Sequence, residues 1–331
     1  MTSPNRALII APAWVGDMVM AHSLVQLLAS QHDELHMAAP PATHALGSRM
    51  AEISTSRLLS FSHGALQFGL RKQIGRELRE QDFQAAYVLP NSWKSALVPY
   101  FADIPRRVGW QGEARFVLLN DRRKLDEERY PLMIERFMAL ADPQGELPAE
   151  YPLPRLQVDP ANLARVVAEL GLHTERVVGL CPGAEFGAAK KWPAEHYAAL
   201  ARTLLDQDYN VWLLGSPKDQ ADCARIAELA PGAINLAGRT QLVDAVDLLS
   251  VCQQVVCNDS GLMHIACALG VPTVGVFGST SPGFTPPLGE HAQVAEIELD
   301  CRPCFQRECP LGHLNCLRQL QPSEVLAKLA I

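Results

Sequence analysis

The stretch VVCNDSGLMHIACALGVPTVGVFGST, residues 255–280, places two apolar runs on either side of one polar group. Residues 254–257 and 273–277 have the continuous valine-rich pattern of strands that are buried on both faces. A helix is predicted to begin at about Gly261, between the two runs. This strand-helix-strand order is typical of a parallel sheet with crossover helices. Burying the carboxylate of Asp259 without a partner would cost free energy, so this side chain is expected to meet a partner or a ligand.

The same alternation continues along the whole chain. In the first half, strands are predicted at residues 7–11, 35–39, 58–61 and 85–89, with helices at about 22–31 and 66–80. In the second half, strands are predicted at 177–181, 211–214, 233–236, 254–257 and 273–277. Helices are expected there after Pro193, near Asp219, after Thr240 and after Gly261. The predicted fold class is therefore α/β, with doubly wound parallel sheets.

A linker near the middle of the chain predicts two domains. Residues 142–160 are rich in turn residues, and the four prolines between 148 and 160 favour an extended backbone. The predicted domains are residues 1–155 and 156–331, and the C-terminal helix packs either on its own domain or back on the N-terminal one. Ligands of such sheets bind beyond the carboxyl ends of the strands, so a shared cleft is expected.

Composition and charge narrow the function classes. The 331 residues carry a net charge of -7, which argues against general nucleic-acid binding. Residues 1–155 hold 17 Lys and Arg against 17 Asp and Glu, so of the totals of 29 and 36 the remainder holds 12 against 19. Basic groups at 71–79, 106–107 and 122–124 are either solvated surface or a surface for an acidic partner.

The start of the chain has neither a transmembrane run nor the layout of a secretory signal, and the nine cysteines suit a reducing compartment. The expected location is the cytoplasm.

Three small-residue loops in the second half suggest a nucleotide-diphosphate pocket. The chain has no G-x-G-x-x-G and no P-loop, but the backbone amides at any helix N-terminus can hold a phosphate. LCPGAEFGAAKKWP at 180–193 brings Lys190 and Lys191 to such a loop, and LLGSPKDQ at 213–220 brings Gly215 and Ser216. In the third loop, Asp259 or Ser260 either caps the helix or contacts a ligand. His264 is either a structural residue or a ligand contact.

The first half contains one comparable loop. LIIAPAWVGDMVMAHSLVQLL, residues 8–28, reads as a strand, a turn at Gly16 and a helix, with Asp17 at the helix start. Two interpretations of Asp17 remain open. It is a helix N-cap, or it is a general base that takes a proton from an acceptor hydroxyl.

Taken together, these motifs resemble bacterial lipopolysaccharide heptosyltransferases of glycosyltransferase family 9. The motifs that carry the resemblance, between residues 8 and about 282, are AWVGDMVMAHSLVQLL, LPNSWKSALVP, RRVGW, CPGAEFGAAKKWP, LLGSPKDQ, LAGRTQL and NDSGLMHIACALGVPTVGVFGSTSP. The resemblance implies a GT-B architecture of two Rossmann-like domains that face a cleft. It also implies inverting transfer without a metal or other cofactor.

The resemblance also assigns roles. It matches Asp17 to the catalytic base and Lys190 to the group that neutralises the donor diphosphate. The residues matched to ADP-sugar binding are Lys190, Gly215, Ser216, Thr240, Asp259, Ser260, Gly261 and His264. Asn91, Ser92, Trp93 and Lys94 fall where an acceptor is handled. Position 260 carries Ser where some family members carry Thr, which keeps the hydroxyl.

The implied reaction is transfer of L-glycero-D-manno-heptose from ADP-heptose to the first heptose of heptosyl-Kdo2-lipid A. The acceptor is anionic and lies at the inner membrane surface, so peripheral attachment at the cytoplasmic face is an open possibility. Alternatives are a family member with a different core acceptor, a nucleotide-sugar-binding protein without transfer activity, and an epimerase of GT-B fold.

The strongest pattern outside the resemblance is Cys301-x2-Cys304-x4-Cys309-x6-Cys316, with His313 nearby. Four thiols within 16 residues suit a structural Zn2+. The spacing is not that of the commonest zinc modules. The favoured interpretation is therefore reduced cysteines in a proline-rich loop; a zinc site is the second interpretation and a disulfide the third. No metal site is therefore predicted.

Overall fold

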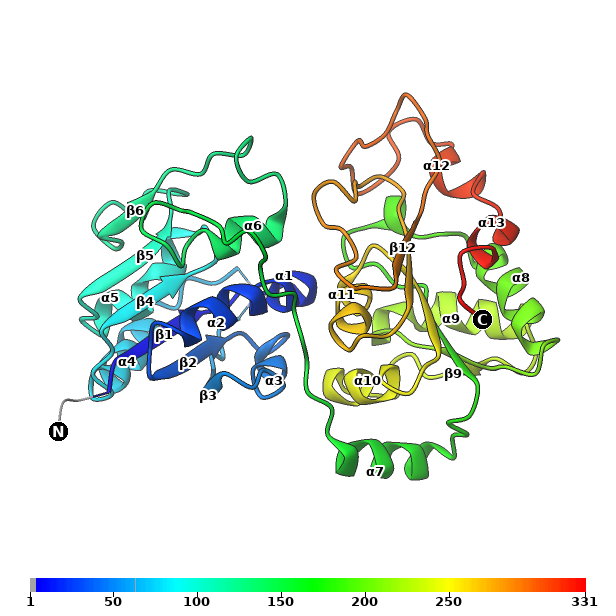
Figure 1. Ribbon diagram of the computed structural model, residues 1–331, viewed down its shortest axis with the longest axis horizontal. Helices are drawn as coiled ribbons and strands as arrows, with labels where there is room; N and C mark the ends of the chain where they lie inside the picture. The colour runs from blue at the N-terminus through cyan, green and yellow to red at the C-terminus, as the bar shows by residue number, and fades with distance from the viewer. Residues whose placement is uncertain (1–3, 63) are drawn as a thin grey trace. The chain divides into compact units, whose positions relative to one another are not determined.

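The computed structural model describes residues 4–62 and 64–331. The chain divides into two compact units, one ending at Pro154 and the other beginning at Arg155 (Figure 1). This division falls one residue before the predicted boundary.

The N-terminal unit contains a six-stranded parallel sheet in the order β3-β2-β1-β4-β5-β6. Its strands are β1 (Arg6–Ile10), β2 (Glu34–Ala39), β3 (Ile53–Leu58), β4 (Ala85–Val88), β5 (Arg106–Trp110) and β6 (Asp121–Arg123). Its helices are α1 (Val15–Met20), α2 (His22–Ala29), α3 (His44–Gly47), α4 (Phe68–Arg79), η1 (Trp93–Ala96), α5 (Leu97–Phe101) and α6 (Met133–Met138).

The C-terminal unit contains a second six-stranded parallel sheet, in the order β12-β11-β10-β7-β8-β9. Its strands are β7 (Val177–Cys181), β8 (Asn210–Leu213), β9 (Ile234–Asn235), β10 (Gln254–Asn258), β11 (Thr273–Val276) and β12 (Ala292–Ala295). Its helices are α7 (Pro160–Leu170), η2 (Ala188–Lys190), α8 (Ala194–Leu205), η3 (Pro217–Asp219), α9 (Gln220–Leu229), α10 (Leu242–Leu249), α11 (Gly261–Ala268), α12 (Asn315–Arg318) and α13 (Pro322–Leu326).

Both sheets have the same strand order when each is numbered from its own first strand, namely 3-2-1-4-5-6. This is the order of the doubly wound dinucleotide-binding fold, so that prediction is confirmed in each unit. The order reverses direction between β1 and β4 in the first sheet, and between β7 and β10 in the second. Ligands of this fold bind in the crevice at that switch point, so the loops after these four strands are where a site is expected.

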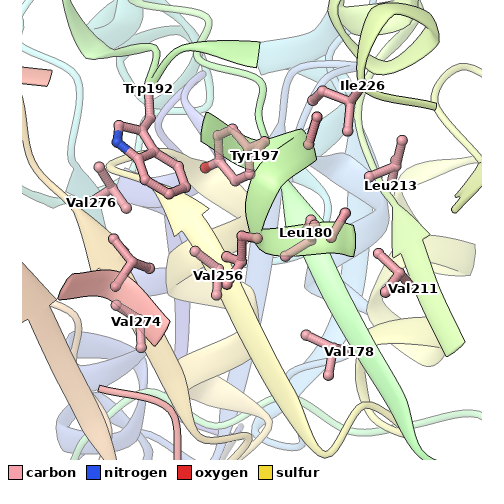
Figure 2. Close-up of a cluster of buried hydrophobic side chains, with 14 of the residues drawn as sticks. Val178, Leu180, Trp192, Tyr197, Val211, Leu213, Ile226, Val256, Val274 and Val276 are labelled. Atoms are coloured by element: carbon pink, nitrogen blue, oxygen red, sulfur yellow. The ribbon is translucent and has the colours of Figure 1, made fainter. Parts of the chain in front are cut away.

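The valine side chains of the strands in the C-terminal unit form part of its hydrophobic core (Figure 2). Val178, Val256 and Val274 come from three neighbouring strands and have no exposed surface. Trp192 and Tyr197 pack over them, with ring centroids 4.9 Å apart. Burial of such side chains supplies roughly 1.5–3 kcal/mol each, which anchors the loop before α8 firmly on the sheet.

The prediction of a strand at 58–61 is wrong in its position. The observed β3, ISTSRL, lies at the edge of the sheet and is only partly buried, so it lacks the apolar run on which the prediction depended. The short strands β5, β6 and β12 were not predicted, and β5 and β6 begin with charged residues that satisfy no apolar pattern.

The linker begins with a turn, in which the Gly145 amide donates to the Asp142 carbonyl; residues 151–159 form no helix or strand, and α7 then begins at Pro160. The side chain of Asp159 accepts hydrogen bonds from the amides of Ala161 and Asn162, and proline is well suited to the first helical position. Of the two placements expected for the C-terminal helix, the structure has the one on its own unit. Helix α13 packs against α8, and Val325 joins the core below it.

Candidate functional site

Lys190 and Asp259 meet at the switch point of the C-terminal sheet. Lys190 follows β7 and Asp259 follows β10, and Nζ of Lys190 lies 2.6 Å from Oδ2 of Asp259. The same carboxylate oxygen accepts a hydrogen bond from Oγ1 of Thr280, also at 2.6 Å. Asp259 and Thr280 are buried, and the lysine side chain is 14% exposed. The carboxylate at the end of the buried strand therefore has two partners within the protein, both in loops at one edge of the sheet.

Asn258 fixes the loop that carries the lysine. Its side chain has no exposed surface and donates to the carbonyl of Pro182 at 2.6 Å. Its Oδ1 accepts hydrogen bonds from the amide of Trp192 and from the hydroxyl of Tyr197, both at 3.1 Å. Because hydrogen-bonded buried amides are costly to disturb, the loop of residues 182–193, called here the lysine loop, is held on both sides of Lys190.

The capping alternative for Asp259 and Ser260 is wrong. Ser260 occupies the N-cap position of α11 and has an extended backbone, but no side chain makes a capping hydrogen bond there. Asp259 bonds to Lys190 and Thr280 instead. The helix begins at Gly261, so the amides of its first turn and the half-buried Ser260 hydroxyl lie next to Asp259. Such a helix start favours an anion.

His264 lies one turn into α11 and is 4% exposed. Burial lowers the pKa of its imidazole to about 4; the Asp259 carboxylate opposes this and the Lys190 ammonium adds to it. The ring is therefore neutral at pH 7. Its Nδ1 is buried without a hydrogen-bond partner among the described residues. A neutral imidazole beside a lysine can donate or accept a hydrogen bond without adding charge.

Gly215 and Ser216 lie at the carboxyl end of the neighbouring strand β8. The amide and hydroxyl of Ser216 both donate to Asp219, at 2.9 and 2.7 Å. Asp219 in turn lies 3.7 Å from Lys191 of the lysine loop. The Ser216 hydroxyl is thus already engaged in the start of η3, a use that the sequence did not predict.

Thr240 comes from the loop after β9 and is half-buried. The amide of Gly238 in that loop donates to the carbonyl of Gly215 at 3.0 Å. The loops after β7, β8, β9, β10 and β11 therefore lie along one edge of the sheet, and the predicted donor residues all lie on them or on the start of α11.

In the N-terminal unit, Asp17 also follows the strand at the switch point. It is half-buried in the first turn of α1, which begins at Val15, so Gly16 is part of the helix and forms no separate turn. The N-cap residue is Trp14, so the N-cap interpretation of Asp17 is wrong. A carboxylate in the first turn still interacts favourably with the helix dipole.

The predicted acceptor segment, Asn91 to Lys94, follows β4, the strand beside β1. A buried arginine that the sequence did not indicate holds this segment in place. Arg115 donates to Oδ1 of Asn91 at 3.1 Å and to the carbonyls of Pro90 and Trp110. The pKa of this guanidinium is lowered to about 10 by burial, with Glu113 opposing the change.

Three of these four residues have further contacts of their own. The amide of Trp93 donates to Glu113 at 2.9 Å, and Nζ of Lys94 donates to the carbonyl of Gly64 at 3.0 Å. The carbonyl of Ser92 accepts from the Ser95 hydroxyl. These contacts order the backbone of the segment next to the strand end.

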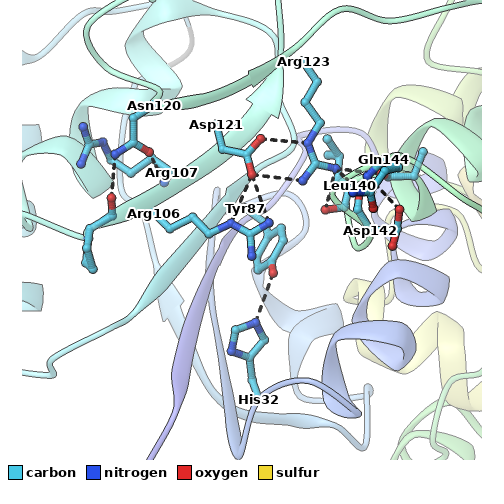
Figure 3. A network of polar contacts seen from close by, with 12 residues as sticks. His32, Tyr87, Arg106, Arg107, Asn120, Asp121, Arg123, Leu140, Asp142 and Gln144 are labelled. Carbon is cyan, nitrogen blue, oxygen red and sulfur yellow. Dashed lines mark hydrogen bonds and ion pairs between the residues drawn. The ribbon is translucent and has the colours of Figure 1, made fainter.

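Several of the basic residues make ion pairs and hydrogen bonds within the N-terminal unit. Arg106 and Arg123 both bind Asp121 at 3.0 Å, and Arg123 also donates to the carbonyls of Ala139 and Leu140 (Figure 3). Arg71 is buried and donates to Leu66 and Lys94 carbonyls. The acidic-partner interpretation is left with the exposed members of these groups, including Arg76, Arg122 and Lys124.

The four cysteines near the C-terminus are free thiols. In the described residues, no group of three or more His, Cys, Asp or Glu side chains is arranged to hold a metal ion. Among the same residues, no helix has the length and apolarity needed to cross a membrane.

The family model of glycosyltransferase family 9, the heptosyltransferases, matches residues 71–315. The chain belongs to this family. Lipopolysaccharide heptosyltransferase 2 of Escherichia coli K12 is 43% identical over 338 residues, covering 98% of this chain and 97% of that protein. Lipooligosaccharide heptosyltransferase 2 of Haemophilus influenzae is 44% identical over 339 residues, covering 97% of each.

The solved structure of E. coli ADP-heptose LPS heptosyltransferase II superposes with a TM-score of 0.87 at 42% identity, covering 98% of this chain and 97% of that one. The predicted GT-B fold class is thereby confirmed. The resemblance to family 9 is also confirmed, and the chain is a glycosyltransferase.

Sequence reasoning missed Thr280, Asn258 and Arg115. Thr280 is the last residue of the 255–280 stretch. It follows an apolar run, just as Asp259 follows the apolar run before it. Neighbouring parallel strands place their carboxyl ends on the same side of a sheet. Applying this rule to the run that forms β11, as well as to β10, could have found Thr280. Arg115 offers no comparable signal, because its burial depends on packing between distant loops.

Proposed function

We propose that this chain transfers L-glycero-D-manno-heptose from ADP-heptose to the first heptose of the lipopolysaccharide inner core. The observation that carries the proposal is the buried Lys190–Asp259–Thr280 cluster at the switch point of a doubly wound sheet. Support comes from the relatives named heptosyltransferase 2 and from the solved ADP-heptose LPS heptosyltransferase II, which matches almost the whole chain.

In this proposal the C-terminal unit binds the donor. The diphosphate is held by Lys190 and by the amides at the start of α11, beside Ser260 and Gly261. As the glycosidic bond to ADP breaks, negative charge grows on the leaving diphosphate, and these fixed donors stabilise it where it develops. Their pre-set positions make this more effective than water, which would have to reorganise. His264 contributes a neutral polar contact, and Gly215, Ser216 and Thr240 line the nucleotide side.

The N-terminal unit supplies the base and the acceptor contacts. Asp17 takes the proton from the acceptor hydroxyl as that oxygen attacks the anomeric carbon on the face opposite ADP, which gives inversion. Asn91, Ser92, Trp93 and Lys94 contact the acceptor. The proposal requires Asp17 and the donor residues to meet on the bound substrates during turnover. It requires no metal or other cofactor, because Lys190 supplies the positive charge.

The acceptor is an anionic glycolipid, so the enzyme is proposed to act at the cytoplasmic face of the inner membrane as a peripheral protein. Exposed basic side chains of the N-terminal unit, such as Arg76 and Arg122, would favour that surface.

The deciding experiment incubates the purified chain with ADP-heptose and a set of truncated core acceptors. Product mass is measured for each acceptor. We expect addition of one heptose to the acceptor that ends in the first heptose, with release of ADP. Addition only to an acceptor that lacks this heptose, or to one that already carries two, would assign the chain to a different step. Conversion of ADP-heptose without any acceptor would indicate an epimerase.

A further inference from the structure

Residues 301–316, called here the cysteine strap, follow β12 and end in the first turn of α12. A cavity of about 20 Å3 is lined by all four of its cysteines and by Ala189 of the lysine loop and Ser279. This volume has room for about one water molecule. The four cysteines are near neighbours around this space, and Cys301, Cys304 and Cys309 all act electrostatically on the thiol of Cys316.

Cys309 is the strap cysteine whose thiol pKa is lowered. It is half-exposed, and backbone amides hydrogen-bond to its sulfur, chiefly that of Leu314. These bonds lower the pKa of the thiol, against a smaller opposing effect of burial. The thiolate, not the thiol, attacks disulfides, so an accessible thiol with a lowered pKa is the reactive one.

The cysteines outside the strap are less accessible than Cys309. Cys181, Cys223, Cys252, Cys257 and Cys267 are all buried. Burial raises the pKa of Cys223 and of Cys267 to about 12, so these thiols are both inaccessible and protonated. Reactivity towards a soluble disulfide is therefore confined to the strap.

A metal ion explains the strap less well than thiol chemistry does. The four cysteines are free, and within the described part of the chain no three potential ligands are arranged to share one ion.

The strap is joined directly to the donor site. The amide of Ala189 donates to the carbonyl of Arg307 at 3.0 Å, and the amide of Phe305 donates to the carbonyl of Ser279 at 2.7 Å. Packing is so close that a Cβ at Gly187 would lie 2.3 Å from the Arg307 carbonyl oxygen. Ala189 and Ser279 directly precede Lys190 and Thr280, so a shift of the strap would move two groups that meet at Asp259.

We propose that the cysteine strap is a thiol–disulfide site that controls donor binding. The sulfur of Cys309 attacks a low-molecular-weight disulfide, forms a mixed disulfide and releases one thiol. A second strap cysteine then displaces the other thiol. Two protein thiols are oxidised to one disulfide, and the small disulfide is reduced to two thiols. The new bond draws the cavity walls together and displaces the Lys190 turn. This last effect rests on the proposed function.

The test uses the full folded chain and glutathione disulfide. We expect the intact mass to fall by about two hydrogens, with peptide mapping that joins Cys309 to Cys301, Cys304 or Cys316. Dithiothreitol should reverse the change. Cys309→Ser should lose this product, whereas Cys252→Ser, a buried control whose sulfur contacts the Leu248 carbonyl, should keep it. If Cys309→Ser does not fold, iodoacetamide labelling of the wild type at pH 7 should modify Cys309 first.

Three results would overturn the proposal. One is a native protein that stays fully reduced under glutathione disulfide, or that labels first at a buried cysteine. Another is about one equivalent of zinc or iron per chain that is released by a thiol-blocking reagent. The third is ADP affinity that does not change with the redox state. Measured by calorimetry, ADP binding should weaken about threefold or more on oxidation and recover on reduction. A disulfide without that change would refute control of donor binding, whereas failure of the reduced protein to bind ADP would instead contradict the proposed function.

Discussion

Lys190 and Asp259 are 69 residues apart in the sequence, and their side chains meet at 2.6 Å on a carboxylate that Thr280 also binds. The three residues follow β7, β10 and β11, which adjoin one another in the sheet. The largely buried Lys190 side chain is held in one place by its carboxylate partner. In the proposed function this fixed charge stabilises a leaving diphosphate, so the cluster is the most informative place for mutation.

Lys190→Ala should weaken ADP binding and slow heptose transfer. Charge-assisted hydrogen bonds contribute about 1.5–3 kcal/mol, which corresponds to roughly 10- to 100-fold in affinity. Calorimetry with ADP measures the binding, and Lys218→Ala is the matched control, because Lys218 is exposed and pairs with Glu185. A Lys190→Ala enzyme with wild-type affinity and rate would place the diphosphate elsewhere.

Thr280→Val should reduce ADP affinity several-fold, and Thr280→Ser should restore it. The valine keeps the shape but removes the donor to Asp259, and loss of one partner of a charged group costs about 1–3 kcal/mol. A role in folding alone would lower the melting temperature of the valine variant and leave the affinity of its folded fraction unchanged. That outcome would remove Thr280 from the site.

Asp17→Asn should leave the fold intact and slow turnover by about 10²–10⁴. Asp17 is not the N-cap of α1, and loss of its charge near the helix N-terminus costs about 0.3–1 kcal/mol through the helix dipole. ADP affinity should hardly change. Asp103→Asn is a suitable control, since Asp103 is exposed and its positive φ is one that Asn tolerates. Wild-type turnover in folded Asp17→Asn protein would mean that another residue is the base.

Acid should destabilise the C-terminal unit through His264. Its pKa is about 4 in the folded chain and about 6.5 when unfolded, so between these values the unfolded state binds more protons. Stability therefore falls as the pH drops from about 6.5 to 4, by up to about 3 kcal/mol. Urea unfolding at pH 7 and pH 5 should show a smaller difference for His264→Asn than for wild type. The exposed control His291→Asn should behave as wild type; equal pH dependence in all three proteins would contradict the assignment.

Chelation should leave heptose transfer unchanged, because in the proposed mechanism Lys190, and not a metal ion, neutralises the diphosphate. Transfer is measured with and without EDTA, and then after addition of Mg2+ or Mn2+. Activity that EDTA abolishes and a divalent ion restores would refute the metal-free mechanism. Unfolding by EDTA would instead indicate a structural ion in the cysteine strap.

The sequence predicted the parts of the fold that depend on local burial. Strands such as β7 and β10 are buried along their whole length, and their valine-rich runs were found within one residue of their ends. Edge strand β3 was misplaced because partial burial leaves polar residues in it. Charge-rich β6 was missed for the same reason.

For the site, the sequence determined which residue types follow which strands, because strand ends and small-residue loops are local features. It supplied Asp17, Lys190 and Asp259. Only the tertiary structure decided that Asp259 binds Lys190 and Thr280 and does not cap α11, and that Arg115 is buried behind Asn91. These contacts join segments that local periodicity treats separately. They follow from the order of the strands in each sheet, which is set by burial of the whole core and not by any one stretch of sequence.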